Sequence, residues 1–250
     1  MTSADVVLDV ENQAVHVHSV GSGAPAYVLV PGLGVSHRYF ARLAAELALS
    51  GTVHVLQMPD FGRTRAPFGI ADLARTAWLA LAELRVSDPV LVGHSMGTQI
   101  VVEMARTRPA ALQAAVLLAP VANPAERSGW RQGLRLGSGI LAEPPRANWI
   151  VVTDSARCGI AVLARRLRVL LAYPIEDHVA EVKVPIVIIR GQRDPVVPLP
   201  WAAELTRRCR HGRLVDVPAA GHIVMFDHPE IVADHCRRAA AAGALWQPVQ

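Results

Sequence analysis

The sequence predicts an α/β protein built on a mostly parallel, doubly wound sheet. Short apolar runs, which suit strands covered on both faces, alternate along the chain with amphipathic stretches that suit helices. One such run ends in the Gly-His-Ser-Met-Gly segment at 93–97 and leads at once into a helical pattern. The length of 250 residues is that of a single domain of this class.

The first half of the chain is predicted to hold a hairpin followed by strand–helix units. Polar and apolar side chains alternate over 5–10 and 14–20, which is typical of an antiparallel hairpin with one solvated face. Trp78 lies on the apolar stripe of a predicted helix and is expected in the core. Buried strands are then predicted at 27–30, 53–56, 89–94 and 114–119, and helices at 38–50, 70–85 and 96–107.

The alternation is interrupted between residues 121 and 183. Gly and Pro are frequent early in this stretch, and two helix-like pieces follow near 153–172. The stretch is too long for a simple loop. We interpret it as a helical cap inserted into a core made of residues 1–120 and 184–250. The core is predicted to continue with strands at 184–189 and 214–217 and helices at 199–209 and 229–242.

Composition and charge argue against several classes of function. The formal net charge is +4, and the basic residues are scattered rather than clustered with aromatic residues, so no nucleic-acid partner is expected. His16 and His18 share one strand face, but no third ligand is near them, so no metal is expected. No Gly-rich dinucleotide fingerprint follows a strand, so no cofactor is expected either.

The cellular setting is also an expectation from the sequence. The N-terminal residues lack the pattern of a signal peptide, and no apolar run approaches the roughly 18 residues of a membrane span. Cys158, Cys209 and Cys236 are odd in number and far apart, which is typical of reduced, structural thiols. We therefore expect a cytoplasmic protein with no membrane partner, and the sequence leaves open whether it forms a homo-oligomer.

The 93–97 segment has the pattern of a nucleophile elbow. Ser95 would lie at the tip of a tight turn in a strained backbone conformation, and Gly93 and Gly97 would leave room for neighbouring elements. The backbone N–H of Met96, at the start of the following helix, would face an oxyanion formed beside Ser95. His94 is expected to point away from Ser95.

Two more residues are predicted to reach the same edge of the sheet. Ligands of such sheets bind beyond the carboxyl ends of the strands. Asp194 and His222 directly follow predicted strands, as Ser95 does, and the chain order is Ser, Asp, His. The alternatives are Asp154, Asp177 and Asp216 for the acid and His228 for the base.

At these residues the chain resembles the α/β-hydrolase superfamily, and in particular its cap-bearing branch of carboxylesterases, lactonases and carbon–carbon bond hydrolases. The family more often begins its oxyanion loop with His, where this chain has Pro31, and its Asp-x-Pro-Gly-x-Gly-x-Ser loop is matched only loosely at 58–64. The resemblance covers 1–120 and 184–250. The matching motifs are the nucleophile segment at 93–97, the acid segment at 191–198, Gly221-His222 with His228-Pro229, and the oxyanion loop Pro31-Gly32-Leu33-Gly34.

The resemblance implies a serine hydrolase without a cofactor, which acts on a small or medium carboxylic ester or lactone. Ser95 would be the nucleophile, His222 its base and Asp194 the group that orients the base. The backbone N–H groups of Leu33 and Met96 would form the oxyanion hole. The alternatives are a carbon–carbon bond hydrolase of a diketone-like substrate or a thioesterase with the same triad and, in another class, a non-catalytic small-molecule receptor.

The residues that line the pocket are less well defined by the sequence. His37, just after the oxyanion loop, and Trp130 and Trp149 in the predicted cap are candidates, and the two tryptophans favour an apolar acyl or aromatic group. Glu143 is the only acidic residue between 127 and 153, so the arginines of this stretch could suit an anionic substrate, although solvated surface arginines explain the same run. These arginines are Arg127, Arg131, Arg135 and Arg146.

Overall fold

The computed structural model describes residues 3–58, 69–126 and 143–245. The strands are β1 (Ser3–Val10), β2 (Gln13–Gly21), β3 (Ala26–Val30), β4 (Thr52–Gln57), β5 (Val90–His94), β6 (Ala114–Leu118), β7 (Ile186–Gly191) and β8 (Gly212–Val217). The helices are α1 (Ala41–Leu47), α2 (Ile70–Glu83), α3 (Met96–Thr107), α5 (Pro145–Cys158), α6 (Ile160–Ala172), α7 (Ile175–His178), α8 (Leu199–Arg208), α9 (Val224–Asp227) and α10 (Pro229–Leu245).

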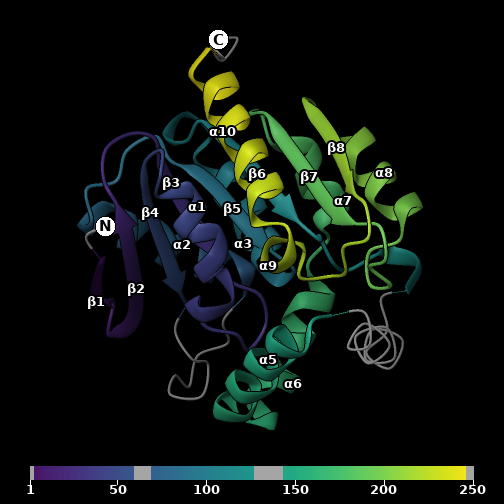
Figure 1. Cartoon of the computed structure of the whole chain (residues 1–250), viewed down its shortest axis with the longest axis horizontal. Coiled ribbons are helices and arrows are strands. Elements are labelled where there is room, and N and C mark those ends of the chain that lie inside the picture. Colours follow the sequence, from purple (N-terminus) through teal and green to yellow (C-terminus); the bar gives the residue numbers. More distant parts are fainter. Residues whose placement is uncertain (1–2, 59–68, 127–142, 246–250) are drawn as a thin grey trace.

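The strands form one eight-stranded sheet in the order β1-β2-β4-β3-β5-β6-β7-β8 (Figure 1). β1 pairs antiparallel with β2, as the hairpin prediction requires, and β2 pairs antiparallel with β4. Each remaining pair of neighbours is parallel. The predicted α/β class, with a mostly parallel and doubly wound sheet, is therefore confirmed.

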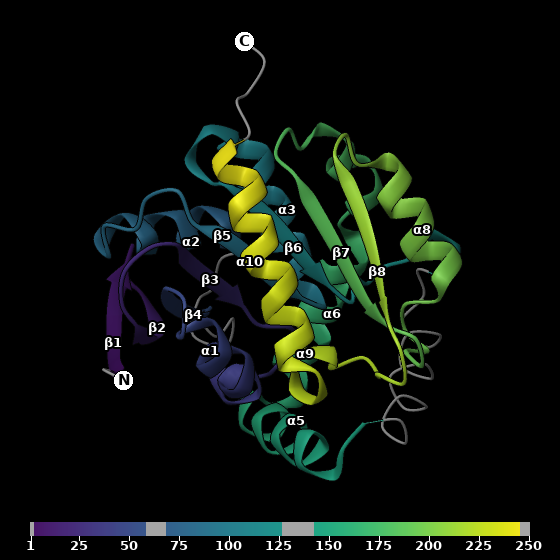
Figure 2. The same cartoon turned by 45° about the horizontal axis from the view of Figure 1, so that its top comes forward.

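Helices cover both faces of this sheet (Figure 2). α1 and α10 pack together over one face, whereas α2, α3 and α8 cover the other. Successive strand residues point to opposite faces, so Leu117 of β6 joins the α2–α3 side of the core and Val116 joins the α1–α10 side. Trp78 of α2 is buried and donates from its indole N–H to the carbonyl of Met104 (3.2 Å), as expected for a core position.

The sheet has a switch point between β3 and β5. From β3 the chain proceeds to β4 on one side, and from β5 it proceeds to β6 on the other side. A crevice therefore opens beyond the carboxyl ends of these two adjacent strands, which is where sheets of this kind bind ligands. Pro31 directly follows β3 and Ser95 directly follows β5, so the topology brings both segments to this crevice.

Between β6 and β7 the chain forms α5 and α6, which we call the α5–α6 pair. Both helices stand away from the layered core, at the lower edge of the sheet in Figure 1. α5 begins at Pro145, earlier than the helical pattern near 153 predicts, because proline suits the first helical turn, where its missing N–H costs nothing. Gly159, with φ of 85°, ends α5 and allows the chain to turn into α6.

Two further observations concern the cysteines and the hydropathy of the helices. Cys209 and Cys236 are free thiols and are buried, as predicted for structural thiols. Of the helices in the described ranges, none has both the length and the apolar character that crossing a bilayer requires.

Leu117→Ala should lower the free energy of unfolding by about 2–5 kcal/mol. Leu117 is fully buried in β6, so the truncation loses apolar contact and leaves a cavity that close-packed neighbours fill only partly. Chemical denaturation followed by circular dichroism measures the change. Leu49→Ala is the matched control, because Leu49 is 68% exposed, and it should stay within about 0.5 kcal/mol of the wild type. An equal loss in both variants would contradict this core assignment.

Candidate active site

Ser95 occupies the tight turn between β5 and α3. Its φ of 53° and ψ of −120° lie in a region that residues with a side chain rarely adopt. Neighbouring elements hold this conformation: the Ser95 N–H donates to the carbonyl of Leu118 in β6 (3.0 Å), and the Ser95 carbonyl accepts from the N–H of Thr98 in α3 (3.0 Å). The strained turn is thus fixed from the sheet and from the helix.

The turn requires glycine on both sides of Ser95. A Cβ added to Gly93 would lie 2.4 Å from the carbonyl oxygen of Gly97, and one added to Gly97 would lie 2.2 Å from that of Val30. No real Cβ atom tolerates such distances, so the start of α3 touches β3 and β5 backbone to backbone. A Cβ on Gly32 would lie 3.2 Å from the Cβ of Ser95, which places the loop after β3 directly beside the serine.

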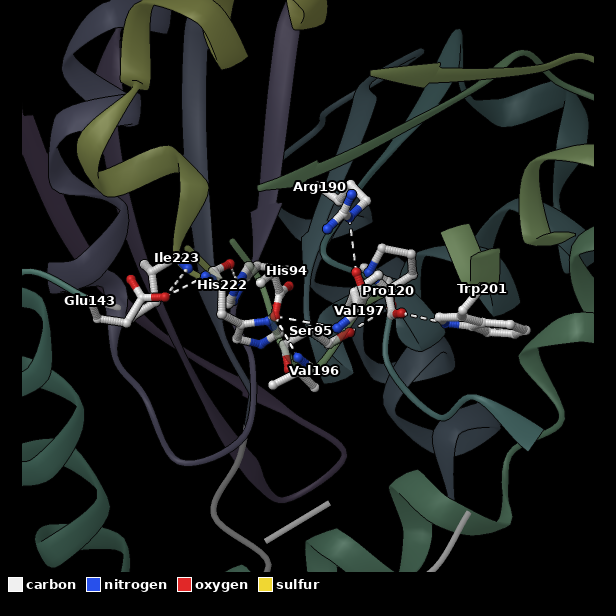
Figure 3. A network of polar contacts seen from close by, with 12 residues as sticks. His94, Ser95, Pro120, Glu143, Arg190, Val196, Val197, Trp201, His222 and Ile223 are labelled. Carbon is white, nitrogen blue, oxygen red and sulfur yellow. Dashed lines mark hydrogen bonds and ion pairs between the residues drawn. The ribbon is translucent and has the colours of Figure 1, made fainter. Parts of the chain in front are cut away.

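Asp194 and His222 reach the same region from the carboxyl ends of β7 and β8. His222 Nδ1 lies 2.8 Å from Asp194 Oδ2, and both side chains are almost completely buried. The other carboxylate oxygen, Oδ1, accepts the backbone N–H groups of Val196 (2.8 Å) and Val197 (3.3 Å). In Figure 3, Val196 and Val197 lie on the opposite side of His222 from Glu143.

The paired charges shift each other's pKa in opposite directions. Burial opposes both charged forms. The Asp194 carboxylate outweighs burial at His222 and raises its pKa, with a smaller contribution from Glu143. In return, the charge and hydrogen bond of His222, with the N–H groups of Val196 and Val197, hold the pKa of Asp194 below its usual value. The geometry therefore favours a negative Asp194 beside a histidine that binds a proton readily.

His94 lies behind Ser95 with both ring nitrogens engaged. Nε2 is 3.0 Å from the backbone carbonyl oxygen of His222, which can only accept, so Nε2 carries the proton. Nδ1 accepts from the hydroxyl of Tyr39 (3.2 Å), and the Tyr39 oxygen accepts the N–H of Gly32 (2.7 Å). Burial and the neighbouring His222 lower the pKa of His94 to about 3, so this imidazole stays neutral. The chain of bonds connects the loop after β3 to the backbone of His222.

Ser95 and His222 line one cavity of about 580 Å³. A volume of this order holds a small molecule. The lining of this cavity is mostly apolar, and the α5–α6 pair supplies a large part of it. Its apolar members include Leu33, Val35, Val121, Val151, Ile160, Leu163, Leu167, Leu170, Val196 and Ile223.

The two backbone groups predicted for the oxyanion hole flank Ser95. Leu33 lies in the loop after β3, and Met96 is the first residue of α3. Within the part of the chain that the structure describes, neither N–H donates a hydrogen bond to another backbone group. Two such donors at a helix start and a tight loop can bind a developing negative charge.

The residues predicted to line the pocket lie elsewhere. His37 is half-buried in a second cavity of about 300 Å³, and its ring stacks on His18 with centroids 4.9 Å apart. The prediction for Trp149 is wrong for the Ser95 cavity: the residue is 68% exposed on the outward side of α5 and, with Phe226, lines a shallow surface hollow. Trp130 is outside the described residues.

The alternatives for the acid are engaged in other contacts. Asp154 of α5 accepts hydrogen bonds from the backbone and hydroxyl of Ser36 (3.0 and 2.6 Å), and Asp216 forms an ion pair with Arg190 (2.9 Å). Asp177 lies near Arg208 (3.5 Å). Among the described residues, no group of three or more His, Cys, Asp or Glu side chains is placed to hold a metal ion.

Two residues beside the site were not identified from the sequence. Tyr39 has no sequence signal, because its role depends on packing against His94. Glu143 accepts hydrogen bonds from the backbone N–H groups of His222 and Ile223, and it also lines the Ser95 cavity. Glu143 is the only acidic residue between 127 and 153, a stretch that contains several arginines, and this is the sequence signal that could have identified it.

Comparisons with known proteins bear on the family and the fold of this chain. A model of the alpha/beta hydrolase family matches residues 27–235. A protein of Pseudomonas savastanoi pv. phaseolicola, provisionally named carbamate hydrolase RutD, is 28% identical over 234 residues, which cover 82% of this chain and 90% of that protein. The pimeloyl-[acyl-carrier protein] methyl ester esterase of Pectobacterium carotovorum is 23% identical over 236 residues, with coverages of 84% and 92%.

A solved structure extends the likeness to the whole fold. The enol-lactonase from Burkholderia xenovorans LB400 superposes with a TM-score of 0.77 at 18% sequence identity. The superposition covers 94% of this chain and all of that chain. The sheet and helices therefore follow the same arrangement as in that protein, although the sequences have diverged widely.

The imidazole of His222 should titrate above the ordinary histidine pKa of about 6.5, and Asp194→Asn should bring its pKa below that value. Burial opposes the imidazolium and the Asp194 carboxylate stabilises it; without that carboxylate, burial is countered only by the smaller contribution of Glu143. Histidine side-chain NMR between pH 4 and 9 measures both titrations. Asp234→Asn, at an exposed ion pair on α10, is the matched control and should leave His222 unchanged. A His222 pKa that is insensitive to Asp194 would contradict the coupling.

Proposed function

Because the chain belongs to the alpha/beta hydrolase family, we propose that it is a serine hydrolase that cleaves small or medium carboxylic esters or lactones through Ser95, His222 and Asp194. One observation carries the proposal. The buried Asp194–His222 pair, 2.8 Å apart, opens into the same cavity as a serine held in a strained turn. The relatives named as an esterase, a lactonase and a carbamate hydrolase all act on an acyl group, which supports this class of reaction.

The reaction would begin with proton transfer from Ser95 to His222. A serine hydroxyl is a poor nucleophile at neutral pH, so the base must take the proton as the oxygen attacks the acyl carbon. Asp194 would stabilise the imidazolium and hold Nδ1 protonated, which leaves Nε2 to accept. His222 would then give the proton to the leaving group, and water would hydrolyse the acyl-enzyme by the same steps in reverse order.

The negative oxygen formed during attack would be bound by the N–H groups of Leu33 and Met96. Each such donor is worth roughly 3–4 kcal/mol in the transition state. The Tyr39 bond to the N–H of Gly32 holds the loop that carries Leu33, so this loop need not reorganise when charge develops. The strained turn at Ser95 would likewise avoid reorganisation, because it fixes the position of the serine relative to the N–H of Met96.

The cavity supports an apolar acyl or leaving group. In this proposal the α5–α6 pair acts as the cap, because it supplies much of the wall opposite Ser95. A lining of leucine, isoleucine and valine favours alkyl chains, and a volume of about 580 Å³ favours small to medium substrates. Cleavage of a thioester or of a carbon–carbon bond would use the same three side chains. The experiments below distinguish these reactions from ester hydrolysis.

Ser95→Ala should reduce kcat/KM for p-nitrophenyl esters by about 10⁴-fold or more, since it removes the nucleophile. Hydrolysis is measured over acyl chains of increasing length, and the best chain length gauges the cavity. Ser87→Ala is the matched control. Ser87 is exposed and lies just before the start of β5, at the end of that strand opposite to Ser95, so the loss of its hydroxyl should leave activity unchanged.

A fluorophosphonate probe should label Ser95 in the wild type and leave Ser95→Ala unlabelled. Activity that survives Ser95→Ala would refute the assignment of the nucleophile. A folded protein that neither hydrolyses any ester nor reacts with the probe would instead favour a binding protein on this fold. Labelling without ester turnover would favour a carbon–carbon bond hydrolase or a thioesterase.

A further inference from the structure

A carboxylate at the start of the α5–α6 pair reaches the backbone that carries His222. Glu143 Oε1 accepts the N–H groups of two successive residues, His222 itself and Ile223 (3.1 Å for the latter). Figure 3 shows the carboxylate on the side of the histidine backbone away from Ser95. Residue 143 is 79 positions before residue 222, so tertiary structure alone creates this contact.

The second carboxylate oxygen is unusual. Glu143 Oε2 is buried and has no hydrogen-bond partner among the described residues. A buried acceptor without a partner destabilises a fold, so a natural sequence retains one where another role outweighs that loss. An uncharged amide could accept the same two N–H groups, so the presence of a carboxylate here points to a role for the charge.

We propose that Glu143 is a positioning residue: it holds the backbone of His222 from the α5 side and places a second negative charge beside the imidazolium that forms during proton transfer. This inference deepens the proposed function and rests on it. Asp194 acts on the ring at Nδ1, whereas Glu143 acts on the main chain of the same residue. Two acids thus fix His222 from two directions, and each comes from a different part of the chain.

The titratable neighbours of His222 are consistent with this role. The groups that face it are Asp194 from the turn after β7, His94 from β5 and Glu143 from the start of the α5–α6 pair. Of these described neighbours, the two acids favour the protonated ring, and His94 stays neutral. Burial raises the pKa of Glu143, while the N–H groups of His222 and Ile223 and the charge of His222 lower it in part. Each charge therefore stabilises the other.

Glu143→Gln separates charge from position. The amide oxygen can still accept both N–H groups, but the negative charge is gone. The pKa of His222 should fall, so the acid limb of kcat/KM for a p-nitrophenyl ester should move to lower pH, because neutral His222 persists further into acid. The plateau kcat should stay within about threefold. Glu143→Ala loses both contributions and should also lower the plateau kcat about 10- to 100-fold, as displaced reacting groups do.

One further measurement, with its own control, keeps the inference independent of ester hydrolysis. Histidine NMR titration in the Ser95→Ala protein reports the pKa of His222 directly, with and without Glu143→Gln, even if no ester is hydrolysed. Glu83→Gln, at the exposed end of α2, is the matched control and should shift neither the titration nor the acid limb.

The outcomes separate the two proposals. A lower His222 pKa in Glu143→Gln supports the inference whether or not the protein hydrolyses esters, whereas failure of the serine hydrolase proposal appears as a wild type without turnover. An unchanged pKa in Glu143→Gln overturns the inference. A merely structural glutamate would lower stability and the plateau together and would leave the acid limb in place, and that result overturns it as well.

Discussion

The close backbone contact at the start of α3 is the constraint on which the rest of the site depends. With no side chain at Gly93 or Gly97, the helix begins in direct contact with β3 and β5. Such proximity forces Ser95 into positive φ, and the hydrogen bond from its N–H to β6 prevents relaxation. A strained residue persists only where its surroundings over-determine it. Here three adjacent strands and one helix do so, and the serine is left at the tip of the turn.

Much of this arrangement could be predicted, because it follows from local chemistry and topology. The apolar runs marked the parallel strands, and carboxyl ends of parallel strands meet at one edge of a sheet. Ser95 directly follows β5, and Asp194 and His222 come a few residues after the ends of β7 and β8, so their convergence required only the strand order. The structure places Asp194 and His222 in contact. The amphipathic pattern likewise fixed α2 and α3 to within about two residues at either end.

What could not be predicted depends on long-range packing. Trp149 is an aromatic residue near the site in sequence, but the register of α5 turns it to the outer surface. Tyr39 and Glu143 act through contacts with residues 55 and 79 positions away, and neither stands in a recognisable motif. His37 follows the loop beside Ser95, yet the loop itself separates the residue from the serine and turns it into the neighbouring cavity. These positions depend on how α5 and α6 pack over the sheet, and no short sequence motif predicts that packing.

The residues of the Ser95 cavity differ in how freely they can be substituted, and this difference affects how such a protein can evolve. The groups suited to bond chemistry are anchored at strand ends by backbone contacts that few substitutions would tolerate. Much of the wall, by contrast, consists of side chains on two helices outside the layered core, and most of these side chains are at least partly exposed. Substitutions on those helices alter the shape of the chamber while the sheet keeps its stability. A lineage can therefore exchange one molecular target for another by drift in α5 and α6, with the reacting groups inherited intact.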